Sequence, residues 1–242
     1  EDGKLGDAGK SLVIEEYLSG VEISILSAVS VAPNDKCGCT YGDNVTIVPF
    51  VTARDHKRLL DGAKGPNTGG MGAIAPVQDV TPEQLADFEK NILQPTLKGM
   101  IEEKMDYRGF IFFGLMLTKN GPKLLEYNVR LGDPETQAVL PLMDFDFADM
   151  CQAIINGTLK DFDFKWKEGY SCAPVAVSGG YPESYKKGFE ISIDKDEVEK
   201  SNTKIFIAGG NMKDDKLVTS GGRVLAASSI GSTFEEAWEN SY

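Results

Sequence analysis

Cysteine and histidine are scarce in this chain of 242 residues, which contains four cysteines and one histidine. Cys37, Cys39, Cys151 and Cys172 are irregularly spaced, which indicates neither a disulfide framework nor a zinc knuckle, and we expect reduced thiols. His56 has no second histidine and no G-x-S-x-G motif as a partner, which argues against a catalytic triad and a histidine-based zinc site. Acid–base chemistry would therefore fall on carboxylates or on the substrate itself.

Long apolar runs and an excess of positive charge are also missing. No segment approaches the roughly eighteen apolar residues of a membrane span, and the start, EDGKLGDAGKS, is too polar for a signal peptide. We therefore expect a cytoplasmic protein that does not bind a membrane. Twenty-five basic and thirty-seven acidic side chains give a net charge of −12, which argues against nucleic acid as a partner. A small anionic ligand can still bind a locally basic pocket.

Two common nucleotide-binding motifs are absent as well. Gly9-Lys10-Ser11 matches the end of a P-loop, but Lys4 occupies the position at which that motif requires its first glycine. No G-x-G-x-x-G fingerprint for dinucleotides occurs. A nucleotide site in this chain must therefore be of another kind.

The apolar set makes up 41% of the chain, which is enough for one large or two modest hydrophobic cores. The patterning predicts strands at residues 12–18, 22–32, 45–51, 109–118, 122–128, 170–178, 188–193, 204–209 and 216–229. It predicts helices at residues 81–104, from Asp133-Pro134-Glu135 onward, at 144–157 and from about 232.

These elements predict an α+β fold with two domains. We expect residues 1–165 to form an antiparallel sheet with flanking helices, and residues 166–242 to form a small, β-rich C-terminal domain packed against it.

The first polar cluster is Glu15-Glu16-Tyr17-Leu18, followed by Glu22. Adjacent carboxylates on a strand point to opposite faces, so one of Glu15 and Glu16 would point inward. An inward carboxylate needs a donor, such as an adenine amino group or ribose hydroxyls. The alternative, which this cluster alone favours, is an edge strand with both acids partly in solvent.

The second cluster combines basic side chains with glycines. Asp55-His56-Lys57-Arg58 comes shortly before Gly65-Pro66-Asn67-Thr68-Gly69-Gly70-Met71-Gly72. Successive N–H groups in such a turn form an anion nest, which predicts a grip on a phosphate or carboxylate. An ordinary loop turn explains the glycines equally well.

The third cluster, Glu126-Tyr-Asn128-Val-Arg130, is the most specific. Glu126 and Asn128 lie two apart on a predicted strand and so share a face, on which Arg130 follows if the strand persists. A carboxylate and an amide oxygen suit magnesium, and an arginine beside them suits an anion. The alternative is a polar strand face followed by a helix that begins at Asp133-Pro134.

The fourth cluster consists of two Gly-Gly pairs, in Ser178-Gly179-Gly180-Tyr181-Pro182 and Ser220-Gly221-Gly222-Arg223. Both lie beside apolar strands, and turns explain them more simply than a binding site does.

Together the segments VIEEYLSGVE, DHKRLLDGAKGPNTGGMGA, LLEYNVRLGDPETQ, SGGYPESYKKG and SGGRVLA resemble the phosphoribosylamine–glycine ligases (glycinamide ribonucleotide synthetases) of the ATP-grasp superfamily. The resemblance runs from end to end, and RLGDPETQ with GPNTGGMGA is typical of this family rather than of ATP-grasp enzymes in general. It implies an ATP-grasp C-terminal lobe in residues 1–165. It also implies an ATP-dependent ligase of purine biosynthesis, which joins glycine to 5-phosphoribosylamine through a glycyl phosphate and releases ADP and phosphate.

The resemblance further implies roles for individual residues, with ATP and Mg²⁺ or Mn²⁺ as cofactors. Metal ligands fall on Glu126 and Asn128. Nucleotide contacts fall on Glu15, Glu16, Tyr17, Leu18 and Glu22. Substrate contacts fall on Asp55, Lys57, Asn67, Thr68, Gly69, Gly70, Met71, Gly72 and Pro134. Arg130 and Asp133 fall on the catalytic positions, where charge neutralisation and positioning matter more than a general base.

In this family an N-terminal domain and the first ATP-grasp lobe precede the stretch with which this chain begins. The resemblance therefore implies the C-terminal half of a ligase, with the N-terminal half and possible further purine-pathway domains as partners, and an inactive isolated chain. Where relatives tend to carry histidine, this chain has Ile207. Two alternatives stay open: another ATP-grasp carboxylate–amine ligase, and a non-catalytic scaffold, which the loss of Glu126 or Asn128 would have favoured.

Overall fold

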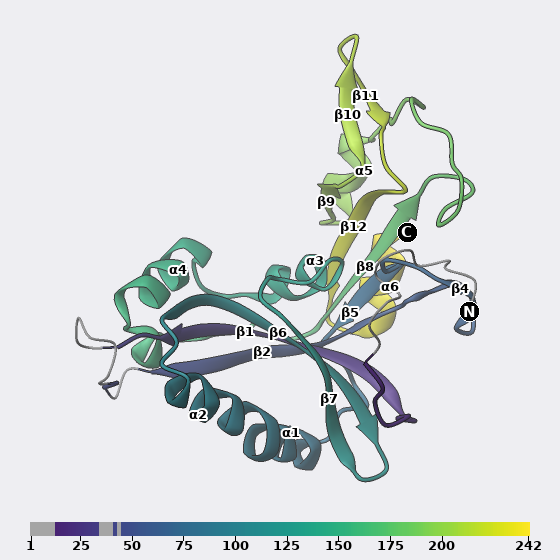
Figure 1. Ribbon diagram of the computed structural model, residues 1–242. Coiled ribbons are helices and arrows are strands. Elements are labelled where there is room, and N and C mark those ends of the chain that lie inside the picture. The colour runs from purple at the N-terminus through teal and green to yellow at the C-terminus, as the bar shows by residue number, and fades with distance from the viewer. Residues whose placement is uncertain (1–12, 34–40, 43–44) are drawn as a thin grey trace.

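The framework of the molecule is one eight-stranded sheet in which every neighbouring pair is antiparallel (Figure 1). The computed structural model describes residues 13–33, 41–42 and 45–242. Gly9-Lys10-Ser11, Cys37 and Cys39 lie outside these residues. Helices flank the sheet, so the predicted α+β fold is confirmed.

The strand order in the sheet is β7-β6-β1-β2-β5-β8-β12-β9. These strands are β1 (Val21–Val31), β2 (Thr46–Asp55), β5 (Gly72–Ala75), β6 (Tyr107–Thr118), β7 (Gly121–Asn128), β8 (Tyr170–Val177), β9 (Lys204–Ile207) and β12 (Arg223–Gly231). Separate hairpins are formed by β3 (Arg58–Leu60) with β4 (Lys64–Asn67) and by β10 (Gly210–Lys213) with β11 (Lys216–Thr219).

The α-helices are α1 (Pro82–Phe88), α2 (Gln94–Glu102), α3 (Glu135–Val139), α4 (Phe147–Asn156), α5 (Lys195–Lys200) and α6 (Phe234–Ser241). A π-helical turn, η2 (Glu89–Leu93), joins α1 to α2, and η3 (Leu140–Leu142) and η4 (Leu159–Asp161) are 3₁₀ turns. No helix in the described part of the chain is long and apolar enough to cross a membrane.

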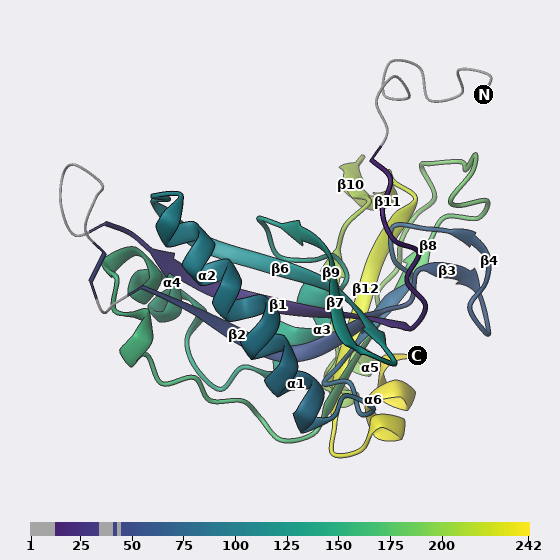
Figure 2. The ribbon, with the colours of Figure 1, turned by 60° about the horizontal axis from the view of Figure 1, so that its bottom comes forward.

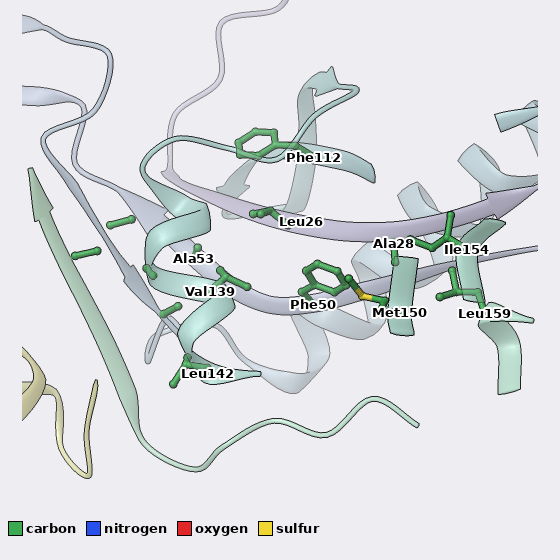
Figure 3. Packing of buried hydrophobic residues seen from close by; sticks show 14 of the residues in the cluster. Leu26, Ala28, Phe50, Ala53, Phe112, Val139, Leu142, Met150, Ile154 and Leu159 are labelled. Carbon is green, nitrogen blue, oxygen red and sulfur yellow. The ribbon is translucent and has the colours of Figure 1, made fainter. Parts of the chain in front are cut away.

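Strand β1 lies between β2 and β6 and contributes to two hydrophobic cores. Ile25 and Val29 belong to the core beneath α1 and α2, which Figure 2 shows running across one face of the sheet. Leu26 and Ala28 point to the opposite face and pack in the core that includes Met150 of α4 (Figure 3). Alternate residues of a strand point to opposite faces, so this β-branched, apolar strand is buried on both sides.

The predicted helix at residues 81–104 is confirmed, although it is not a single α-helix. Thr81 and Gln84 form a capping box around Pro82 at the N-terminus. The π turn η2 lies just before Pro95, which has no N–H to donate to the carbonyl of Asn91.

The predicted strand at residues 12–18 is wrong for the described residues, since Val13–Ser19 form no regular structure. Val13, Ile14 and Tyr17 are about nine-tenths exposed, at 88%, 92% and 93%. The sheet begins only at Val21, and among the described residues no strand pairs with the segment before it. An apolar run becomes a strand only where a neighbour accepts its backbone hydrogen bonds.

The other predicted strands and helices before residue 178 are confirmed, with β2 longer than expected. The strand at 204–209 is also confirmed as β9, and a helix from about 232 as α6. The strand predicted at 188–193 is wrong, because only Glu190 forms an isolated bridge there, with Val218. The stretch 216–229 is two strands, β11 and β12. Patterning did not predict α5, β5, β10 or the β3–β4 hairpin.

The strands after residue 165 extend the main sheet, because β8 pairs with β5 and β12 pairs with β8. The predicted boundary at residues 165–166 lies between η4 and β8, where Trp166 forms an isolated bridge with Met143 and packs against the core that includes Phe50. The division into two domains stays a prediction.

Phe113 is fully buried and packs edge-on against Phe88 and Tyr127. Phe113→Ala would leave a cavity between the sheet and α1, so we expect the free energy of unfolding to fall by about 3 to 5 kcal/mol. Chemical denaturation followed by circular dichroism measures this change. Phe189→Ala, at a position that is 58% exposed, is the matched control and should cost less than about 1 kcal/mol. A similarly small loss for Phe113→Ala would contradict the assigned core.

Candidate functional site

One face of the sheet changes from apolar to polar toward the beginning of β1. Leu26 packs in the core on the α3–α4 side, and Ser24 and Glu22 follow on the same face. Gly114 of β6 lies opposite Ser24, and Glu126 of β7 lies opposite Gly114. The polar side chains of neighbouring strands are thereby brought into one row.

A β-bulge on β7 aims Glu126 into this row. The register with β6 shifts between Gly114, which pairs with Glu126, and Leu115, which pairs with Leu124, so Leu125 is an extra residue. Leu124 packs against the core beneath α1 and α2, whereas Glu126 lines a cavity on the opposite face. Without the bulge these two residues would share a face.

Glu126 and Asn128 do share a face, as predicted. The Nδ2 amide of Asn128 donates a hydrogen bond of 3.0 Å to Oε1 of Glu126. Arg130 does not continue this face, because β7 ends at Asn128. Its exposed guanidinium donates instead to the carbonyl of Leu131, over 3.0 Å.

A cavity of about 190 Å³ lies on this polar face, and Glu22, Ser24, Asp55, Lys57 and Glu126 contribute its polar lining. The Lys57 Nζ donates to Oε2 of Glu22 over 2.5 Å. Partial burial lowers the pKa of Lys57, but the hydrogen bond to Glu22 and the nearby carboxylates outweigh it and raise the pKa above its usual value. Lys57 therefore stays a cation at this acidic surface.

One lining carboxylate, Asp55, lies near a carboxylate behind the lining, Glu135. Glu135, the first residue of α3, is only 4% exposed and accepts a hydrogen bond of 3.0 Å from the Ser24 hydroxyl. Oδ1 of Asp55 is buried and has no hydrogen-bond partner among the described residues. Burial, together with the charge of Glu135, raises the pKa of Asp55 to about 7.

Several backbone amides of the glycine loop, residues 65–72, already donate hydrogen bonds within the protein. The N–H groups of Thr68 and Met71 donate to the carbonyls of Lys57 and His56, each over 2.8 Å. The Gly70 N–H donates to the Thr68 hydroxyl over 3.0 Å. In this conformation the amides of Thr68, Gly70 and Met71 therefore donate within the protein rather than to a ligand, and the role of the loop in substrate binding stays a prediction.

The loop nevertheless lies against other predicted site residues. Gly70 has φ +113°, and a Cβ there would come within 2.5 Å of Pro134 and 2.7 Å of the Asp55 carboxylate. Asp133, just before Pro134, is 49% exposed and forms an ion pair with Arg223. Protein packing thus explains why glycine is needed at position 70, and it brings the loop, Asp55 and the Asp133–Pro134 turn together.

Several predicted site residues lie apart from the cavity lining. Glu15, Glu16 and Tyr17 are exposed and Leu18 is half-buried, so neither Glu15 nor Glu16 points inward. Asn67 is exposed at the end of β4, where it pairs with Arg58 of β3. The geometry leaves the predicted roles of these residues untested.

Sequence reasoning did not single out Ser24, Glu135, Tyr181 or Arg223 as site residues. Glu135 belongs to the RLGDPETQ segment, but a carboxylate after Asp-Pro reads as a charge in the first turn of a helix. Ser24 lies within an apolar strand. Tyr181 and Arg223 directly follow the two Gly-Gly pairs. These pairs were the feature of the sequence that could have pointed to them.

The oxygen-bearing side chains of the site suit a divalent cation that has octahedral coordination and keeps water or phosphate oxygens among its ligands. Within the described ranges, no group of three or more His, Cys, Asp or Glu side chains is arranged to hold a metal ion. Mg²⁺ is bound in many sites by one or two carboxylates plus substrate phosphates, so Glu126 and Asn128 fit it without a third protein ligand.

A family model that matches more than half of the chain places it in the ATP-grasp class. A biotin carboxylase from Campylobacter jejuni has a similar fold, with a TM-score of 0.58 at 11% identity, over 92% of this chain and 44% of that one. A family model described as phosphoribosylglycinamide synthetase, ATP-grasp (A) domain, matches residues 1–136. The model of the C domain of the same synthetase matches residues 171–242. The chain belongs to the phosphoribosylglycinamide synthetase family, as its motifs predicted.

Individual relatives support the same family assignment. A phosphoribosylamine–glycine ligase from Clostridium acetobutylicum is 51% identical over 97% of this chain and 52% of its own length. A trifunctional purine biosynthetic protein from Bos taurus is 44% identical over 97% of this chain and 22% of its own length. The crystal structure of the Thermotoga maritima phosphoribosylamine–glycine ligase matches with a TM-score of 0.75 and 36% identity, over 94% of this chain and 52% of that one. The chain therefore spans about half the length of these single-function relatives.

The half-buried Asp55, whose Oδ1 atom is fully buried, makes the stability of the fold depend on pH. Its pKa is about 7 when folded and near 3.8 when unfolded, so between these values the folded chain holds a proton that the unfolded chain has released. Stability should therefore fall as pH rises from about 4 to 7. Asp55→Asn cannot ionise and should be the more stable variant at pH 8, by up to about 4 kcal/mol, with the gain shrinking toward pH 4.

Urea denaturation at pH 4.5 and pH 8 measures this difference. The control is Asp61→Asn, at an exposed position, which should leave the change in stability between the two pH values as in the wild type. If Asp55→Asn instead loses stability at pH 8, then Asp55 is stabilised as an anion and the assigned environment is wrong.

Proposed function

We propose that the protein containing this chain is an ATP-dependent ligase that joins glycine to 5-phosphoribosylamine, and that this chain forms its C-terminal half. One observation carries the proposal: Glu22, Lys57 and Glu126 line one cavity, with Asn128 beside Glu126, in a chain 51% identical to a phosphoribosylamine–glycine ligase. The products are glycinamide ribonucleotide, ADP and phosphate. The free thiols of Cys151 and Cys172 support a cytoplasmic location.

The reaction needs activation because a free carboxylate is unreactive toward an amine. A carboxylate oxygen of glycine bonds to the γ-phosphorus of ATP, and the bond from that phosphorus to ADP breaks. The amine nitrogen of phosphoribosylamine then bonds to the acyl carbon, and phosphate leaves with the carboxylate oxygen and the electron pair. The nitrogen releases a proton as the amide forms. Positioning and charge neutralisation contribute most to such a reaction.

Glu126 and Asn128 would hold a divalent cation, Mg²⁺ or Mn²⁺. The Asn128 amide nitrogen already points to Glu126, which leaves its carbonyl oxygen as an acceptor. A bound cation would supply charge compensation for the phosphate oxygens of ATP. The bulge at Leu125 keeps Glu126 on the cavity side, and so orients this ligand before any substrate binds.

Two cations, Lys57 and Arg130, can bind anionic groups of the substrates. Lys57 keeps its positive charge beside Glu22 and can bind a phosphate or carboxylate oxygen. Arg130 is exposed, and its other guanidinium donors can bind an anion. Asp55, Thr68, Gly70 and Asp133–Pro134 would surround glycine and the amine substrate.

We assign the nucleotide to Glu22 and to the segment Glu15–Leu18 before β1. The exposed side chains of Val13, Ile14 and Tyr17 support this assignment, because they leave an apolar surface for a base or for another part of the protein. The N-terminal half of the same protein would supply the opposite side of the nucleotide site. Additional purine-pathway domains are possible partners, since the Bos taurus relative is trifunctional.

Glu126→Gln in the full-length protein should lower ADP release that depends on glycine and phosphoribosylamine by about a thousandfold or more, because a charged metal ligand is lost. Asn128→Ala removes a neutral ligand and should cost less. A coupled assay for ADP at saturating magnesium measures both. Lys123→Ala, at an exposed position on the same strand, is the control and should keep wild-type activity.

Wild-type activity in Glu126→Gln would refute the metal assignment. A wild-type protein that releases ADP without any dependence on glycine would refute the proposed reaction itself.

A further inference from the structure

The two Gly-Gly turns of the C-terminal region are joined to each other. The Ser178 N–H donates to the carbonyl of Gly222 over 2.7 Å, and the Ser178 hydroxyl donates to the carbonyl of Gly221 over 2.8 Å. These bonds fix the turn after β8 against the turn before β12. The residues that follow the two glycine pairs, Tyr181 and Arg223, are thereby held side by side.

Tyr181 reaches from its turn to the glycine loop. Its ring occupies the space in which a side chain at position 222 would lie, so Gly222 allows the ring to pack against the backbone. The Tyr181 hydroxyl accepts a hydrogen bond of 2.8 Å from the N–H of Gly69. One backbone amide of the loop is therefore satisfied by a side chain 112 residues away.

Arg223 reaches the turn that precedes α3. Its Nη1 donates to the carbonyl of Asp133 over 2.9 Å and to Oδ1 of Asp133 over 3.2 Å. Its Nη2 donates to Oδ2 of Asp133 over 3.3 Å. A Cβ on Gly69 would lie only 3.3 Å from Nε of Arg223, so the guanidinium also packs against the glycine loop. Such forked bonds restrict orientation as well as distance.

The two loops that receive these contacts are themselves in contact. Gly70 is buried between the Asp55 carboxylate and the ring of Pro134. Tyr181 and Arg223 belong to the part of the chain matched by the C-domain family model, whereas both loops belong to the part matched by the ATP-grasp model. The C-terminal region thus contacts the substrate end of the candidate site through two specific side chains.

We propose that Arg223 and Tyr181 are positioning residues, which hold the Gly69–Gly70 loop against the Asp133–Pro134 turn and so set the geometry around glycine and the amine substrate. This inference rests on the proposed function and adds a role for the C-terminal region in it. Both side chains contact loops at the site rather than the hydrophobic cores. A displacement of about 1 Å in a positioned substrate can cost about a hundredfold in rate.

The test is steady-state kinetics of the full-length protein with Arg223→Ala, Arg223→Lys and Tyr181→Phe. For Arg223→Ala we expect kcat/KM for glycine to fall by about 10- to 100-fold, with the KM for ATP within about twofold of the wild type, because the metal ligands lie on β7. Arg223→Lys keeps the positive charge but not the forked hydrogen bonds to Asp133. Its kcat/KM for glycine should therefore lie between the values of Arg223→Ala and the wild type. Tyr181→Phe should show a smaller loss of the same kind.

Arg108→Ala is the matched control, because it breaks another arginine–aspartate ion pair. Arg108 and Asp106 form this pair over 2.8 Å at the N-terminal end of β6. It should leave both kinetic constants unchanged. Hydrogen exchange provides a readout that is independent of activity: in Tyr181→Phe the Gly69 amide should exchange at least about tenfold faster than in the wild type.

Three outcomes are decisive. Wild-type kinetics in Arg223→Ala, or an equal loss for glycine and ATP, would overturn the positioning role. Arg223→Ala is uninformative if it does not fold, and the two milder variants then decide. The positioning role is overturned if Arg223→Lys and Tyr181→Phe keep wild-type kinetics and if the Gly69 amide of Tyr181→Phe exchanges at the wild-type rate. A wild-type protein that forms no amide from glycine and phosphoribosylamine would refute the proposed function, while the exchange result would still test the loop contact.

Discussion

The antiparallel pairing of β1 with β6 and β2 is the constraint on which the rest of the structure depends. It buries β1 on both faces, so its residues alternate between two cores. The same alternation carries Ser24 and Glu22 onto the α3–α4 side, where the apolar core ends. Glu126 joins them only because a bulge on β7 changes the register. The candidate site is therefore the polar continuation of a hydrophobic face, and its side chains are oriented by the same pairing that stabilises the fold.

Carboxyl groups are crowded on this face, and the few cations near them determine how they behave. Glu22 is paired with Lys57, and Asp133 with Arg223, whereas half-buried Asp55 lies near Glu135 and has a pKa of about 7. A fold that gathers acids in this way loses stability through repulsion and burial unless cations or ligands compensate. The arrangement fits a site whose substrates bring a metal ion and an amine, and it links the acidic composition of the chain to its proposed chemistry.

Much of the fold could be predicted because alternation and turn residues are local signals, as for β6, β7 and the helix that Thr81 caps. The strand predicted at 12–18 was wrong because an apolar run does not reveal whether a neighbouring strand exists. For the site, spacing predicted that Glu126 and Asn128 share a face. It could not reveal Arg223, which meets Asp133 across 90 residues, or the internal partners that occupy the loop amides. Such contacts depend on tertiary packing, which no local pattern encodes.

In the proposed function, this sheet face belongs to a ligase that activates glycine as an acyl phosphate. The most direct measurement follows oxygen atoms from glycine labelled with ¹⁸O in its carboxylate, incubated with the full-length protein, ATP, magnesium and phosphoribosylamine. Because phosphate leaves with a carboxylate oxygen, the account predicts one ¹⁸O atom in each phosphate released with the amide, detected by mass spectrometry. Amide formation with phosphate that contains no ¹⁸O would contradict the account.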